Sequence, residues 1–179
     1  MEIEDAAPIN LFVHGITHKA QAITKGYMTL TRSGNYICAI SLIRILLDCA
    51  LLAWAGLAAR NRDQFFLAYN AGTPINRLED KNGNKLTQGF IVRTLSEQLP
   101  AVKEIFDDAS GFVHTSRAAQ DGSIDLTNEV RLLSYESFQT PERARKKANE
   151  QMRQANDILI TILAKWVRLK HGEEISLSL

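Results

Sequence analysis

The segment Ile37–Ala59, with the sequence ICAISLIRILLDCALLAWAGLAA, decides the fold. It is apolar on nearly every face of a helix, which is the pattern of a helix enclosed by others. Its 23 residues are long enough to cross a bilayer. However, Arg44 and Asp48 lie near its centre, and each charge costs about 2.5–3.5 kcal/mol in a membrane. Because these residues are four apart, they can pair on one helix face. We therefore expect the central helix of a soluble bundle, with no membrane span.

The segments around this central helix also carry helical patterns. Apolar residues recur at helical spacing in five of them, which are 9–30, 63–69, 89–99, the stretch that begins at Pro100, and the stretch from Thr140-Pro141 to His171-Gly172. Asn82-Gly83 indicates a tight turn between 75 and 86. Partial alternation over 123–137 predicts a short strand or an extended loop. Short connections between long helices favour antiparallel neighbours. The sequence therefore predicts an all-α, up-and-down bundle of four to five principal helices, with a small hairpin or loop insertion near 75–86.

The chain has 179 residues of ordinary globular composition, which corresponds to one domain. We expect a single helical-bundle domain over 1–172 and a frayed C-terminal tail over 173–179. Cys38 and Cys49 are eleven residues apart, or roughly 16 Å on one helix, too far for a disulfide. They are expected to be small core residues. Met1–Asp5 is acidic and is not followed by the apolar run of a signal peptide, so a cytoplasmic location is expected.

The charges are unevenly distributed along the chain. The formal net charge is only +1, which argues against a protein that binds nucleic acid over its whole surface. Residues 142–171 contain eight Lys or Arg against three acidic residues, a net charge of +5. This segment is interpreted first as a solvated helix face. The alternative is a basic face for RNA or for a partner protein.

Motifs for cofactors and metals are missing from the sequence. There is no Walker A run, GxGxxG, CxxC or HExxH, so neither a cofactor nor a metal is expected. His14 and His18 are four residues apart and share a helix face, but nothing in the sequence indicates a third ligand. Polar-face or interface histidines are the favoured interpretation.

A second informative segment is Ser110–Ser116, with the sequence SGFVHTS. Ser110, His114 and Arg117 lie at i, i+4 and i+7, so they share a face if the helix continues. A histidine with an ordinary pKa suits acid–base chemistry near neutral pH, and an arginine suits a phosphate. The alternative is that His114 only stabilises the C-terminal end of the helix dipole.

Two segments together carry a family resemblance. Ser41–Asp48 (SLIRILLD) is similar to an LxRxxxE helix, and Ser110–Ser116 is similar to an SxxVHxS helix ending. With the long final helix, they resemble uncharacterised bacterial helical families related to the HEPN superfamily. The resemblance implies a small helical bundle that forms a homodimer. Active HEPN members are metal-independent ribonucleases of toxin–antitoxin and anti-phage defence systems.

The resemblance also indicates which catalytic group is missing. The HEPN motif is an Arg, four to six residues, and then a His. His114 matches the His, but Asp107, Asp108 and Ala109 stand where the Arg is expected. The resemblance therefore implies a non-catalytic binding or regulatory module. A divergent ribonuclease is the alternative, with His114 as acid–base and Arg44 or Arg117 holding the phosphate.

Two interpretations of Arg44 and Asp48 remain open at this point. They either line a pocket with His114 or form an ion pair that fixes how neighbouring helices pack. The candidate catalytic residues are His114, Arg44 and Arg117. The candidate ligand-binding residues are Arg44, Asp48, Ser110, His114 and Ser116. RNA or a nucleotide is a possible ligand. A third hypothesis is an adaptor that docks a protein partner through its last helix.

Overall fold

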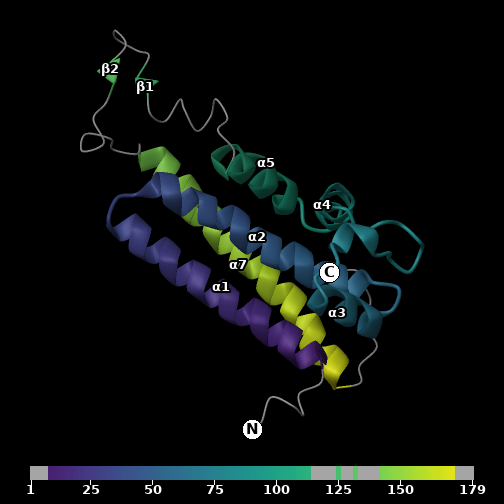
Figure 1. Cartoon of the computed structure of the whole chain (residues 1–179). Helices are drawn as coiled ribbons and strands as arrows, with labels where there is room; N and C mark the ends of the chain where they lie inside the picture. Colours follow the sequence, from purple (N-terminus) through teal and green to yellow (C-terminus); the bar gives the residue numbers. More distant parts are fainter. Residues whose placement is uncertain (1–7, 114–123, 126–130, 133–141, 172–179) are drawn as a thin grey trace.

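The computed structural model describes residues 8–113, 124–125, 131–132 and 142–171. The elements, with the labels of Figure 1, are α1 (Pro8–Arg32), α2 (Tyr36–Ala58), α3 (Arg62–Asn70), α4 (Gln88–Ser96), α5 (Ala101–Val113) and α7 (Glu142–Lys170). The long helices α1, α2 and α7 lie side by side, and the shorter α4 and α5 cover α2 from another side (Figure 1). The predicted all-α bundle is confirmed.

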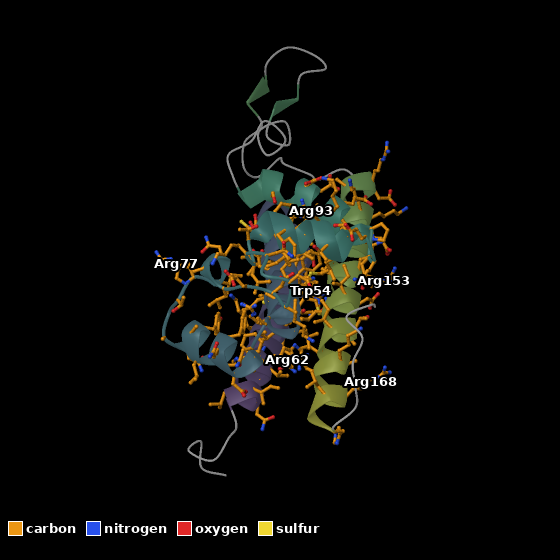
Figure 2. All side chains as sticks on the ribbon, turned by 90° about the vertical axis from the view of Figure 1, so that its right-hand side faces the viewer. Trp54, Arg62, Arg77, Arg93, Arg153 and Arg168 are labelled. Atoms are coloured by element: carbon orange, nitrogen blue, oxygen red, sulfur yellow. The ribbon has the colours of Figure 1, made fainter. Side chains whose placement is uncertain are left out.

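Helix α2 is the centre of the bundle, because it contacts α1, α3, α4, α5 and α7. The preceding turn positions it. Gly34 has a φ of 78°, which lets the chain reverse after α1, and the Asn35 side chain accepts a hydrogen bond from the Cys38 backbone N–H. Trp54 lies among the side chains in the middle of the molecule (Figure 2). Of the described helices, α2 alone is long and apolar enough to span a membrane, and 56% of its most apolar window is buried in the bundle.

Hydrogen bonds and aromatic contacts join the three long helices. The Tyr27 hydroxyl on α1 donates to Asn149 Oδ1 on α7 at 2.7 Å. Trp166 Nε1 on α7 donates to the Ala53 carbonyl on α2 at 3.1 Å. Gly56 on α2 has no side chain, and this lets the Trp166 and Phe65 rings approach the α2 backbone. The same end of the bundle therefore packs aromatic groups from α1, α3 and α7 around α2.

The predicted insertion is a small, tightly hydrogen-bonded loop. It follows the short 3-10 helix η2 (Ile75–Arg77) and brings Glu79 opposite Lys85. Asp80 organises its turn by accepting the backbone N–H groups of Asn82 and Asn84. Burial alone would raise the pKa of Asp80, but these hydrogen bonds outweigh it and lower the pKa. The loop packs back on the bundle through Asp80, which is opposite Ala59.

Three sequence predictions concern the segments before and after α7. The alternation over 123–137 corresponds in part to a short antiparallel pair, β1 (Ile124–Asp125) with β2 (Arg131–Leu132). The predicted Thr140-Pro141 start of the last helix and the tail over 173–179 lie outside the described residues.

The prediction that both cysteines are core residues is wrong for Cys38. Cys38 is exposed, whereas Cys49 is buried, and both thiols are free. Cys38 lies in the first turn of α2, where one side of the helix is left open. An apolar run therefore does not bury each of its members.

Gly56 offers a direct test of the packing around α2. A Cβ atom there would lie 3.1 Å from the Trp166 ring and 3.2 Å from the Phe65 ring. We expect Gly56→Ala to lower the free energy of unfolding by about 1–3 kcal/mol, although alanine favours a helix. Gly15→Ala is the matched control, because no atom lies within 4 Å of its added Cβ, and it should stabilise by about 0.5–1 kcal/mol. Urea unfolding measures both. A Gly56→Ala variant as stable as the wild type would contradict this packing.

Tyr27 gives a prediction on pH. Burial, with a smaller effect of Tyr36, raises the pKa of Tyr27 to about 12. Between about pH 10 and 12 the unfolded chain releases this proton while the folded chain keeps it, so stability falls as pH rises. Urea unfolding from pH 8 to 11 should show a shallower alkaline loss for Tyr27→Phe than for the wild type. If wild type and Tyr27→Phe lost stability equally with rising pH, burial would not raise the pKa of the Tyr27 hydroxyl.

Candidate functional site

A buried arginine joins two helices of the bundle. Arg44 on α2 is only 7% exposed and forms an ion pair with Asp48, one turn further along the same helix. Its Nε donates to Ser110 Oγ on α5 at 3.0 Å. Its guanidinium carbon also lies 4.1 Å from the centre of the Phe106 ring, within cation–π distance. We call Arg44, Asp48, Gln88, Phe106 and Ser110 the Arg44 cluster.

Local helix geometry builds each part of this cluster. Arg44 and Asp48 are at i, i+4 on α2, and Phe106 and Ser110 are at i, i+4 on α5. The Ser110 hydroxyl, which accepts from Arg44, donates to the Phe106 carbonyl of its own helix. Gln88, the first residue of α4, donates from Nε2 to Asp48 Oδ1 at 3.1 Å. The cluster therefore fixes α4 and α5 against α2.

The electrostatics of the cluster are those of a helix-packing contact. The buried guanidinium is compensated by the Asp48 carboxylate, whose side chain is 42% exposed. Its Nε and one terminal nitrogen have partners inside the protein, and its flat face covers Phe106. Arginines that bind phosphate present two parallel N–H groups to the ligand. In this arrangement Nε and one terminal nitrogen of Arg44 are used for contacts within the protein.

The structure brings together three of the six candidate residues found in the sequence, namely Arg44, Asp48 and Ser110. His114, Ser116 and Arg117 lie outside the described residues, so their proximity to Arg44 stays a prediction. The ion pair between Arg44 and Asp48 is present, and its link to α5 accords with the packing interpretation. Sequence reasoning missed Gln88 and Phe106. The i, i+4 spacing of Phe106 and Ser110 was the one available signal.

The positions expected to hold the ribonuclease Arg have structural partners instead. Asp107 pairs with Lys103 on the same helix at 2.6 Å. Asp108 Oδ2 accepts from Gln151 Nε2 at 2.6 Å and pairs with Lys147 Nζ at 2.5 Å, which links α5 to α7. Ala109 is fully buried. An acidic residue that links α5 to α7, Asp108, thus lies where the HEPN motif has its Arg.

Acids on the same helix balance part of the charge of the basic last helix. Lys146 pairs with Glu142, and Arg153 pairs with both Glu150 and Asp157. Arg153 and Arg168 extend from the outer side of α7 (Figure 2). Two large apolar side chains are also exposed on α7, Ile160 at 62% and Val167 at 53%. The charges fit a solvated face, and the apolar pair gives the helix a second kind of exposed surface.

A groove of about 520 Å³ lies between α1, α2 and α3. We call it the α1–α3 groove. Its lining residues are Leu11, Phe12, Gly15, Ile16, Lys19, Asp48, Cys49, Leu52, Tyr69 and Asn70. Asp48 belongs both to this groove and to the Arg44 cluster. Among the predicted site residues Asp48 alone lines it, and no motif in the sequence pointed to the other groove residues.

The histidine pair on α1 is exposed. The His14 and His18 rings are stacked with centroids 6.4 Å apart. Within the described ranges, no group of three His, Cys, Asp or Glu residues is placed to hold a metal ion.

No known protein family, no curated protein and no solved structure matches the chain. The class that the described residues define is thus an all-α helical bundle with a buried arginine cluster. The relationship to the HEPN superfamily stays a prediction.

The Arg44 cluster predicts an asymmetry between two acidic residues. Asp48→Asn leaves Arg44 as a buried cation without its counter-ion, and we expect a loss of about 1–3 kcal/mol in the free energy of unfolding. Asp107→Asn is the matched control, because its pair with Lys103 is more than half exposed on both sides, and it should change stability by less than about 0.5 kcal/mol. Chemical unfolding measures both variants. Equal losses would show that Arg44 does not depend on Asp48.

Proposed function

We propose that the chain is a non-catalytic helical binding or regulatory module of the HEPN-like kind. One observation carries the proposal: the Arg44 guanidinium is buried and bound to Asp48 and Ser110. A ribonuclease that lacks the motif Arg needs another cation beside the scissile phosphate. Arg44, one of the two substitutes, already has partners inside the protein.

The acidic residues at the motif positions support the same conclusion. Asp107 and Asp108 would repel a phosphate at the place where the motif Arg would attract it. Asp108 is held there by its contacts to Lys147 and Gln151 on α7. Asp108 therefore contributes to helix packing, Asp107 pairs within its own helix, and neither supplies the charge that RNA cleavage requires.

The setting of the module follows from the resemblance. HEPN domains are commonly homodimers, so we propose that this chain is a homodimer in the cytoplasm, in a bacterial defence or toxin–antitoxin system. A protein partner, RNA or a nucleotide is the proposed ligand, and no membrane is involved.

A second candidate function is an adaptor that docks a protein through α7. Ile160 and Val167 are seven residues apart, or two helical turns, so they lie on the same face. Both side chains are more than half exposed. An exposed apolar pair on one face of this helix is the feature that favours this alternative.

An RNA cleavage assay without added metal tests the proposal. Structured and single-stranded RNAs are incubated for several hours with the wild type, His114→Ala and Arg117→Ala. We expect no cleavage by the folded wild type. Cleavage that persists equally in both variants arises outside this site, from a contaminating nuclease. Cleavage that is lost in His114→Ala would overturn the proposal and favour the divergent ribonuclease.

A further inference from the structure

The α1–α3 groove has the size and walls of a small-molecule site. Its volume of about 520 Å³ falls within the range of about 300–1,000 Å³ that is common for such sites. The groove is apolar along most of its length, where Leu11, Phe12, Ile16 and Leu52 form its sides. The Tyr69 ring packs edge-on against Phe12, with 5.5 Å between the centroids, and lies with Asn70 at the α3 end.

Gly15 opens this groove at a cost to the helix. A glycine inside a helix is less stable than alanine by about 0.5–1 kcal/mol. Gly26 and Gly56 have packing reasons, because a Cβ there would lie 3.3 Å from Leu42 and 3.1 Å from Trp166. A Cβ on Gly15 would meet no atom within 4 Å. Packing therefore does not require Gly15, and the space it leaves is part of the groove.

The charges at the other end of the groove favour an anion. Lys19 and Asp48 are the charged residues that line it. Asp48 is already compensated by the buried Arg44, whereas Lys19 is exposed and pairs with no acid among the described residues. Burial raises the pKa of the nearby Cys49 thiol, which keeps it uncharged. Among the described residues, the positive charge on Lys19 is therefore left without a counter-ion.

The distance between the charged and apolar ends of the groove limits the length of the ligand. Lys19 and Leu11 are eight residues apart on α1, or roughly 12 Å. A single ammonium is one point charge, which matches the single negative charge of a carboxylate, whereas a phosphate monoester carries about −1.5 to −2. We propose that the α1–α3 groove binds a small amphipathic carboxylate, with its apolar body between Leu11 and Leu52 and its carboxylate on Lys19. This inference goes beyond the proposed function and holds whether or not the chain cleaves RNA.

Three probes that share one apolar chain test the proposal, namely octanoate, octanol and octylamine. Each is titrated into the full chain by calorimetry, and the ¹H–¹⁵N signals of Gly15 and Lys19 report where it binds. We expect octanoate to bind about two- to fivefold more tightly than octanol, which is the range of an exposed ion pair. Octylamine should bind most weakly. Equal affinities for the three probes, or no octanoate binding at millimolar concentration, would overturn the proposal.

Two matched pairs of variants locate the ligand. Gly15→Leu fills the groove and should abolish octanoate binding, whereas Gly89→Leu, another open position outside the groove, should leave it unchanged. Lys19→Met should weaken octanoate about two- to fivefold and spare octanol, whereas Lys25→Met on the same helix should change neither. Octanoate binding that persists in Gly15→Leu, or an octanoate affinity that Lys19→Met leaves unchanged, would show that octanoate does not bind in the α1–α3 groove.

Discussion

Helix α2 is apolar on almost every face, so its neighbours have to cover it from several sides. Five helices do so, and the remaining contacts of the described bundle follow from that requirement. The aromatic groups of α1, α3 and α7 close around one end of α2, where Gly56 makes room for them. Near its middle lies Arg44, the one buried cation in the described part of the chain, and its charge has to be compensated. Asp48 supplies the charge, and Ser110 supplies a hydrogen bond from α5.

This arrangement connects stability to function. A buried arginine that holds two helices together is a poor ligand for a substrate, because releasing it would leave Asp48 and Ser110 without their partner. A ligand or partner would instead bind a surface that the packing leaves open. The described residues include the α1–α3 groove and the exposed pair Ile160 and Val167 on α7 among such surfaces. The groove touches the Arg44 cluster at Asp48, so a ligand there would lie beside the contact that positions α4 and α5.

Most of the helices could be predicted from the sequence, but few of the contacts in the Arg44 cluster could. Helical periodicity placed the helices, and the charge pair within the apolar run identified Arg44 and Asp48. The contact from Arg44 to Ser110 joins residues 66 positions apart, which no local pattern encodes. Cys38 was assigned to the core because its segment is apolar, but helix packing buries only the sides that neighbours reach. The sequence did not identify Gly15 as a groove residue. A glycine in an amphipathic helix gives the same pattern whether it allows close packing or borders a groove.

We propose that Arg44 is a packing residue and not a phosphate ligand. The ¹H–¹⁵N signal of its Nε–H group, recorded with and without RNA, tests this claim directly. We predict a single, slowly exchanging signal that RNA leaves unchanged, because Ser110 already accepts this hydrogen bond. A rapidly exchanging signal in the free protein, or one that shifts when RNA is added, would show that the Arg44 guanidinium is available to RNA.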